Sequence, residues 1–116
     1  MVGAEVYGYS NDVPTNPSMF ETLGLDKKIH HHFGDIRNRE EMNDYVQRVK
    51  PDFLFHLAAQ AIVSTSYKEP FDTITTNVVG TASVLEAIRN ITWECTCVLL
   101  TSDKVYENVE WIWGYR

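Results

Sequence analysis

The stretch DFLFHLAA at residues 52–59 decides the fold, because it is almost continuously apolar. This composition is typical of a strand in a parallel sheet that is covered on both faces. Two shorter strands are expected before it, at residues 4–9 (AEVYGY) and 31–36 (HHFGDI), and one after it, at residues 96–101 (TCVLLT).

One helix is expected directly before this stretch. It starts at Asn38, with Glu41 at the position where a capping box places an acid, and it ends at Lys50-Pro51. Its apolar face is formed by Met42, Tyr45, Val46 and Val49. A shorter helical turn is expected at residues 18–23, inside the proline-containing loop 11–25.

A second helix is expected to open at Pro70, because proline is favoured at the first helical position, and to stop at Asn90. Apolar residues at spacings of three and four predict one buried stripe along it, formed by Phe71, Ile74, Val78, Ala82, Leu85 and Ile88. The order strand, strand, helix, strand, helix, strand predicts an α/β fold with a parallel sheet.

Length and composition exclude several classes of protein. At 116 residues the chain is one domain at most, with ordinary globular contents of hydrophobic (44%) and charged (22%) residues. A net charge of −6 argues against a nucleic-acid partner. No apolar run approaches the roughly 20 residues of a membrane span, and the start of the chain lacks a signal-peptide pattern. Cys95 and Cys97 are expected to be reduced residues of a cytoplasmic protein, with a redox or metal role as the alternative.

Chemistry is expected where strands end, because ligands of doubly wound sheets bind beyond the carboxyl ends of the strands. The stretch LLTSDKVY at residues 99–106 changes there from apolar to polar, with two hydroxyls, a carboxylate and an ammonium at residues 101–104. The last predicted strand therefore delivers a polar cluster to the expected ligand edge.

Several motifs resemble the extended short-chain dehydrogenase/reductases, of the NAD-dependent epimerase/dehydratase type, and among them the CDP-glucose 4,6-dehydratases. The segments that carry the resemblance are HLAAQ (56–60), TNVVGT (76–81), LLTSDKVYEN (99–108) and WIWGYR (111–116). GYSNDVPTNPSMFE (8–21) and HHFGDIRN (31–38) fit the same group, so the likeness covers essentially the whole chain. The related dTDP-glucose dehydratases have Asp-Glu where this chain has Asp103-Lys104.

The resemblance implies a Rossmann-like fold, an NAD cofactor and a nucleotide-sugar substrate. The implied reaction converts CDP-glucose to CDP-4-keto-6-deoxyglucose, by oxidation at C4, loss of water across C5 and C6, and return of the hydride to C6. It implies a role in deoxysugar synthesis for polysaccharide, and a homo-oligomer for the full-length enzyme. A dTDP-glucose dehydratase or a nucleotide-sugar epimerase is the alternative enzyme.

The same resemblance assigns the polar cluster. Asp103 is implied as the acid for the departing 6-hydroxyl, Lys104 as the candidate base for the C5 proton, and Ser102 as the partner of the 4-hydroxyl. Lys104 could act as a base only if burial or a nearby cation lowered its pKa. The alternative is that Asp103 and Lys104 only neutralise each other at a junction between strand and loop.

Cofactor and substrate contacts are implied at other strand ends. Asp35 and Ile36 are placed beside the adenine ring, although Asp35 could instead be an acid at a helix start. Leu57, Ala58 and Ala59 would let the dinucleotide approach closely, or would serve helix packing. Gln60 could reach the sugar. Asn77 is a poor helix former in mid-helix, so it has a specific polar role, here cofactor binding, or is simply exposed.

Two further clusters are less informative. His30, His31 and His32 are not expected to bind a metal, because only alternate residues of a strand share a face. Trp111, Trp113 and Tyr115 alternate, which suggests an aromatic face that packs on a substrate domain, or simple hydrophobic anchoring.

The chain also departs from the family pattern. Its six glycines form no Gly-rich dinucleotide turn, and no tyrosine has a lysine four residues later. The strand at residues 4–9 ends without the acid that marks NAD, and Asp12 is the nearest. Residues 1–116 are therefore expected to be a single, incomplete NAD-binding domain from inside a longer chain. A non-catalytic remnant that binds a partner chain is the alternative.

The resemblance further implies a first strand before residue 1, which would lie in the middle of a doubly wound sheet. Without it, the strands at residues 4–9 and 52–59 lose their shared neighbour. Each is then expected to expose unpaired backbone groups and an apolar face. The isolated chain is accordingly expected to be unstable, prone to aggregate or dependent on another chain.

Overall fold

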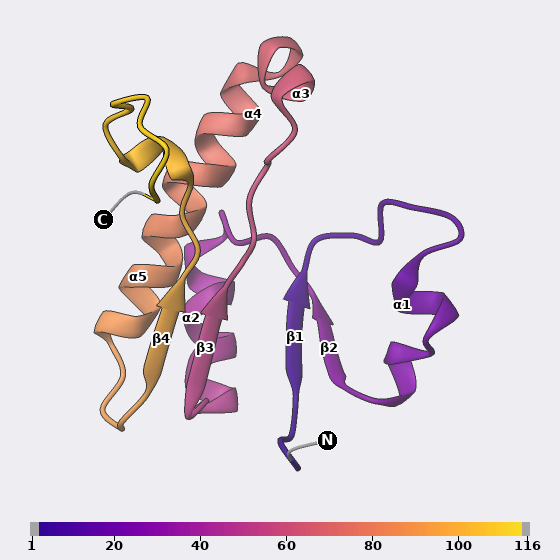
Figure 1. Cartoon of the computed structure of the whole chain (residues 1–116). Coiled ribbons are helices and arrows are strands. Elements are labelled where there is room, and N and C mark those ends of the chain that lie inside the picture. The colour runs from indigo at the N-terminus through magenta and orange to yellow at the C-terminus, as the bar shows by residue number, and fades with distance from the viewer. Residues whose placement is uncertain (1–2, 115–116) are drawn as a thin grey trace.

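The computed structural model describes residues 3–114, apart from the side chain of Lys104. Strands and helices alternate along most of this range (Figure 1). The elements are β1 (Tyr7–Ser10), α1 (Met19–Thr22), η1 (Leu25–Lys27), β2 (His30–Phe33), α2 (Arg39–Val49), β3 (Phe53–His56), α3 (Val63–Lys68), α4 (Pro70–Ile74), η2 (Thr75–Gly80), α5 (Thr81–Arg89), β4 (Thr96–Leu99) and η3 (Asp103–Val105).

Within residues 3–114 the strands form two parallel pairs rather than one sheet. β1 pairs with β2, with Tyr7 opposite His30, and β3 pairs with β4, with Phe53 opposite Thr96. All the strand arrows point the same way in Figure 1, in the order β4, β3, β1, β2 across the view. The α/β class and the parallel direction are therefore confirmed, and each strand is shorter than predicted.

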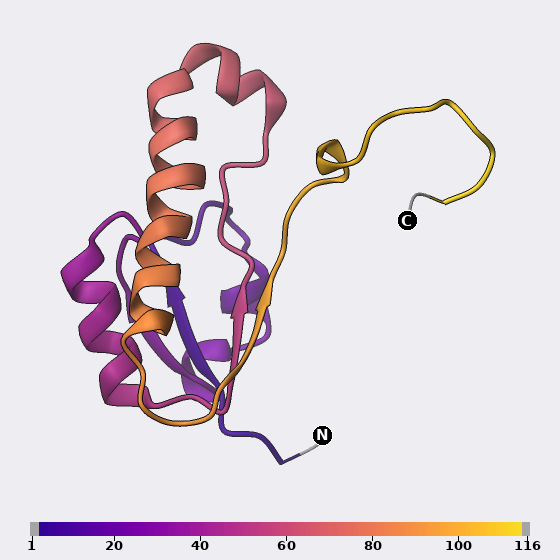
Figure 2. The same ribbon diagram turned by 90° about the vertical axis from the view of Figure 1, so that its left-hand side faces the viewer.

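The core lies between the strands and two helices, α2 and α5. Both helices lie on the same side of the strands (Figure 2). The buried apolar cluster consists of Ile36, Met42, Val46, Val84 and Ala87, with Leu54 and Trp93 among the half-buried residues packed against it. Tyr45 of α2 also donates a hydrogen bond to the carbonyl of Gly8 in β1, at 3.0 Å. Through these contacts α2 joins the first strand pair to the second.

The helix ends confirm the predicted start at Asn38 and end at Lys50, although the Glu41 carboxylate accepts from the side-chain amide of Asn38, at 3.1 Å. The side chain of Asn38 accepts a hydrogen bond from the backbone N–H of Glu41 at 3.3 Å, and α2 ends at Lys50, which has a left-handed backbone (φ 51°). Ser18 and Glu21 form a reciprocal capping box at the start of α1, inside the predicted helical turn at residues 18–23. These signals are local, since each joins residues only three positions apart.

The predicted buried stripe of the second helix is wrong except at Ile88, which is half-buried and packs against the core. Phe71, Ile74, Val78 and Leu85 are exposed, and the buried side chains or backbone sites are Gly80, Ser83, Val84 and Ala87. The middle of this helix, η2, is a π-helix, whose wider turn breaks the spacing of three and four on which the prediction rests. Small residues then form the face that approaches the core. The preceding helix α3 was not predicted either.

The strand β3 is covered on one face instead of two. Leu54 packs against the core and His56 is buried, whereas Phe53 and Phe55 are 64% and 61% exposed. The carbonyls of Val6 and Ser10 accept hydrogen bonds from the β2 side, so the alternate backbone groups, of Tyr7 and Tyr9, point to the other side of β1. Within residues 3–114, β1 and β3 each have one edge without a paired strand.

Among the described residues, no helix is long and apolar enough to cross a membrane.

The exposed face of β3 predicts the solution behaviour of the isolated chain. We expect the chain to self-associate, and Phe55→Lys to reduce that association without lowering stability, because a lysine on an open strand discourages pairing. Leu54→Lys is the matched control on the same strand, and it should unfold the chain because it places an ammonium in the core. Light scattering and urea titration measure both effects. A dispersed amide spectrum from a monomeric unaltered chain would contradict the expectation.

Candidate functional site

Most of the residues singled out in the sequence follow the carboxyl ends of strands. Asp35 and Ile36 follow β2, residues 57–60 follow β3, and Ser102 and Asp103 follow β4. Because the strands are parallel, these loops lie at the same end of the molecule, the upper end in Figure 1. Asn77 lies on η2, the middle part of the long helix beside them, which α4, η2 and α5 form over residues 70–89.

Asp35 is held by one neighbouring residue, Arg37. Its Oδ1 accepts hydrogen bonds from the Arg37 backbone N–H at 2.9 Å and from Nε at 3.0 Å. Its Oδ2 accepts from Nε at 2.9 Å and from Nη2 at 2.5 Å. The hydrogen bonds from the Arg37 side chain lower the pKa of Asp35, so this carboxylate is ionised at neutral pH and acts as an acceptor.

Ile36 is a buried residue of the core, packed against the long helix at Gly80. A Cβ at position 80 would lie 2.6 Å from Cγ1 of Ile36, and closer still to Cδ1. Gly80 has an ordinary helical backbone (φ −60°, ψ −47°), so the space for Ile36, rather than backbone freedom, requires a glycine here. The pair fixes the loop after β2 against the helix.

Asn77 fixes the loop after β3. Its Oδ1 accepts a hydrogen bond from the backbone N–H of Gln60 at 2.7 Å, and its Nδ2 donates to the carbonyl of Gln60 at 2.9 Å. The Gln60 side chain donates to Thr73 Oγ1 at 2.8 Å and accepts from the backbone N–H of Ile62 at 2.7 Å. Both side chains therefore have partners inside the protein. Asn77 thus holds the loop at residue 60, and its contact with the cofactor stays a prediction.

Leu57, Ala58 and Ala59 are exposed, in an extended segment between β3 and Gln60. Their small or apolar side chains leave the backbone at the strand end open to approach. The segment is held at both ends, by the β3–β4 ladder before it and by the Asn77–Gln60 pair after it.

Ser102 and Asp103 lie together after β4. The hydroxyl of Ser102 donates to Oδ1 of Asp103 at 3.1 Å, and Asp103 begins the short helix η3. The chain beyond β4 leads away from the helices in Figure 2. The Lys104 side chain lies outside the described residues. Of the predicted acid–base pair, the structure therefore describes only the acid, Asp103. Trp111 and Trp113 follow, both exposed, and Tyr115 lies outside the described range.

His56 is a buried polar residue at the strand ends that sequence reasoning missed. It is 6% exposed at the end of β3, and its Nε2 lies 2.9 Å from Thr81 Oγ1 on α5. Burial lowers the pKa of His56, so the ring is neutral at neutral pH. The signal was present as a single polar residue within an apolar run. The contact joins the central strand to the helix that carries Gly80.

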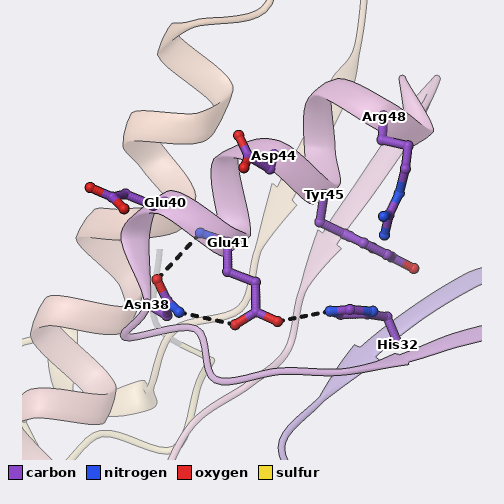
Figure 3. A pocket seen from close by; sticks show the side chains of 7 residues that line it. All are labelled: His32, Asn38, Glu40, Glu41, Asp44, Tyr45 and Arg48. Atoms are coloured by element: carbon purple, nitrogen blue, oxygen red, sulfur yellow. Dashed lines mark hydrogen bonds and ion pairs between the residues drawn. The ribbon is translucent and has the colours of Figure 1, made fainter.

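Two hollows in the described part of the surface lie elsewhere, along α2. One of about 460 Å³ is lined by His32, Asn38, Glu40, Glu41, Asp44, Tyr45 and Arg48 (Figure 3). His32 Nε2 lies 2.9 Å from Glu41 Oε1 and the ring stacks on Tyr45. A second hollow of about 280 Å³ shares His32, Tyr45 and Arg48. Histidines of β2 line one side of both hollows. Neither hollow includes the residues at the carboxyl ends of the strands.

The three histidines of β2 have three different partners. His30 faces Glu5, His31 faces Ser10, and His32 faces Glu41, each at 2.9 Å. Among the described residues no group of three or more His, Cys, Asp or Glu side chains is placed to hold a metal. Cys95 and Cys97 are free thiols whose sulfur atoms lie 3.7 Å apart. The pKa of Cys95 is raised to about 11, mainly by burial.

Comparison with known proteins gives a consistent relationship. The family model of GDP-mannose 4,6 dehydratase matches residues 2–112. A CDP-glucose 4,6-dehydratase from Salmonella typhimurium is 44% identical over 115 residues, which is 99% of this chain and 32% of the relative. A CDP-paratose 2-epimerase from Salmonella typhi is 34% identical over 82% of this chain and 27% of the relative. The chain thus spans about a third of the length of these relatives.

Solved structures give the same relationship. A UDP-glucose 4-epimerase from Stenotrophomonas maltophila, with bound NAD and formylated UDP-arabinopyranose, has a TM-score of 0.75 at 25% identity. The match covers 95% of this chain and 33% of that one. A UDP-glucose 4-epimerase from Thermotoga maritima, with UDP-glucose, has a TM-score of 0.63 at 29% identity, over 73% of this chain and 26% of that one.

The Ile36–Gly80 contact predicts the effect of a small substitution. We expect Gly80→Ala to lower the free energy of unfolding by about 1–3 kcal/mol, because the added methyl overpacks the core. At an exposed helix position the same change would raise the free energy of unfolding by roughly 1 kcal/mol. The sign of the change in stability therefore tests the contact by itself. Urea denaturation measures it. Ile36→Ala in the Gly80→Ala background should recover part of the loss, and additive losses would contradict the contact.

Burial of His56 predicts a pH dependence. Since its pKa is lower in the folded chain than in the unfolded chain, the unfolded state binds more protons between the two values. The free energy of unfolding should therefore carry no penalty from His56 above about pH 6.5, the ordinary histidine value. It should fall as the pH drops from there towards the folded pKa of His56. His56→Gln keeps a partner for Thr81 and should flatten this part of the curve. Equal slopes for both proteins would contradict the prediction.

Proposed function

The chain belongs to the GDP-mannose 4,6 dehydratase family, and we propose that it forms the cofactor-binding part of a nucleotide-sugar 4,6-dehydratase acting on CDP-glucose. The observation that carries the proposal is the 44% identity with a CDP-glucose 4,6-dehydratase over 99% of the chain. The loops at the strand ends support it, because they gather an ionised carboxylate, an open backbone segment and a Ser-Asp pair. In this proposal residues 1–116 are a single, incomplete domain.

The described residues fit the adenine half of NAD. The carboxylate of Asp35 is an ionised acceptor at a strand end, suited to the amino group of adenine. The exposed backbone of residues 57–59 has only small or apolar side chains, so a dinucleotide could approach it closely. Asp35 and residues 57–59 would hold the cofactor. The buried Ile36 would support Asp35 from the core side, and Asn77 would shape the loop after β3 through Gln60. Bound NAD would supply reversible hydride acceptance.

The residues after β4 would carry the elimination of water. Ser102 would donate a hydrogen bond to the oxygen on C4 of the sugar, where negative charge develops. Lys104, in its neutral form, would take the proton from C5. As the bond between C6 and its oxygen breaks, Asp103 in its acid form would give its proton to the departing hydroxyl, which leaves as water. In the chain without substrate the single hydroxyl proton of Ser102 goes to Asp103 at 3.1 Å, so the two groups lie side by side. Ser102 would turn this proton from Asp103 to the oxygen on C4 when the sugar binds.

An epimerase is the second candidate. Relatives and solved neighbours include a CDP-paratose 2-epimerase and UDP-glucose 4-epimerases, which share the fold of this chain. Epimerisation needs no acid for a leaving hydroxyl, so the mass of the product separates the two reactions. A dehydratase releases one water from the sugar nucleotide, and an epimerase leaves its mass unchanged.

We also infer that the proposed enzyme is a cytoplasmic homo-oligomer. The exposed apolar residues Phe71, Ile74, Val78 and Leu85 run along one long helix and would be covered by a second copy. The free thiols of Cys95 and Cys97 support a reducing compartment.

The test replaces the matching third of the Salmonella typhimurium relative by this chain. We expect the chimera to release water from CDP-glucose. When the reaction runs in D2O, the product should carry deuterium at C5. Asp103→Asn should lower turnover by about 10²- to 10⁴-fold, because it removes the general acid. Asp26→Asn, the same chemical change in η1, is the matched control and should have no effect.

Mass spectrometry of the product decides between the candidates. An isomer of unchanged mass would indicate an epimerase. A folded chimera that binds NAD and leaves CDP-glucose unchanged would favour the non-catalytic alternative. Full turnover by the Asp103→Asn chimera would contradict the proposed role of Asp103 as the acid, but not the proposed dehydratase activity.

A further inference from the structure

Arg37 joins two elements that are far apart in the sequence. Through Nε, Nη2 and its backbone N–H it holds both oxygens of Asp35, and through Nη1 it donates to Oδ1 of Asp72 at 2.5 Å. Asp72 lies in the first turn of α4. The loop after β2 is thereby tied to the start of the long helix, 35 positions along the chain.

The same helical turn also holds the loop after β3. Thr73, next to Asp72, accepts the hydrogen bond of the Gln60 side chain at 2.8 Å, and Asn77 binds the backbone of Gln60 from one turn further on. Both loops proposed to hold NAD are therefore fastened to residues 72–77. Arg37 is the connection on the Asp35 side.

The geometry of Arg37 determines what Asp35 can accept. A carboxylate has about four acceptor positions, and the planar guanidinium occupies one edge of it with parallel N–H groups. The remaining acceptor positions point in directions fixed by that edge. A lysine could supply the charge but not this two-point hold, because an ammonium is a point donor.

Building on the proposed function, we propose that Arg37 is a positioning residue that orients Asp35 to accept the amino group of a 6-aminopurine and to reject a 6-oxopurine. An ionised carboxylate can only accept hydrogen bonds, whereas the oxo group of a 6-oxopurine is itself an acceptor. Facing Asp35, that oxo group would set two acceptors against each other. The selectivity thus depends on Asp35 keeping one orientation, which the hydrogen bonds from Arg37 provide.

The first measurement needs no cofactor. Titration of the Asp35 carboxyl carbon by NMR in the 116-residue chain should show its pKa rising in Arg37→Met, since the main cause of its lowering is removed. Arg39→Met is the matched control, because it removes the same charge two positions away on an exposed residue. An unchanged pKa for Asp35 in Arg37→Met would overturn the proposal.

The second measurement compares the binding of NAD with that of nicotinamide hypoxanthine dinucleotide, its 6-oxo counterpart, by calorimetry with the same chain. We expect the unaltered chain and Arg39→Met to prefer NAD. Arg37→Met should weaken NAD binding by about 10- to 100-fold, the value of one hydrogen bond to a charged group, and should leave the 6-oxo dinucleotide nearly unaffected. Arg37→Lys keeps the positive charge and should still lose most of the preference for NAD. It is the second variant, in case Arg37→Met fails to fold.

The outcomes separate this proposal from the proposed function. An unaltered chain that binds both dinucleotides equally, or neither, would overturn the proposal. So would an Arg37→Met chain that keeps the preference for NAD. Turnover of CDP-glucose by the chimera is measured independently. A chimera without turnover, together with a preference for NAD that depends on Arg37, would overturn the dehydratase and support the positioning role.

Discussion

The packing of Ile36 against Gly80 is the contact on which the rest of the structure depends. Ile36 lies in the middle of the loop between β2 and α2, and Gly80 lies where the π-helical part of the long helix passes into α5. A residue with a side chain at position 80 would hold the helix away from this loop. With glycine there, the helix comes close enough for Val84 and Ala87 to complete the core with Met42 and Val46 of α2.

This close approach also places the polar side chains of the helix. Asp72 meets Arg37, and Thr73 and Asn77 meet Gln60, so the loops after β2 and β3 are held from one element. The proposed cofactor site is therefore built from side chains that bond to each other before any ligand is bound. In physical terms, most of the ordering of these loops is achieved by folding and would not have to be achieved by binding.

Local signals made much of the fold predictable. The caps at Ser18 and Asn38, the proline at position 70 and the apolar strand at residue 53 each depend on neighbours within a few residues. The buried face of the long helix was not predictable, because a π-helix changes the phase of the pattern and leaves Phe71 and Val78 exposed. For the site, the positions at strand ends could be predicted, but the partners could not. The pairs Arg37–Asp72 and Gln60–Asn77 join residues 35 and 17 positions apart, and no periodic pattern links them.

The division of the strands into two pairs has a consequence for how the molecule unfolds. Within residues 3–114 no backbone ladder runs from β1 to β3, so loss of one pair does not itself break the other. The pairs are coupled by side chains, namely the core around Ile36, the Tyr45–Gly8 hydrogen bond and the Arg37–Asp72 ion pair. Cooperativity is thus carried by a few contacts of α2 and its preceding loop. Weakening them would turn one unfolding transition into two, with each strand pair melting as a separate unit.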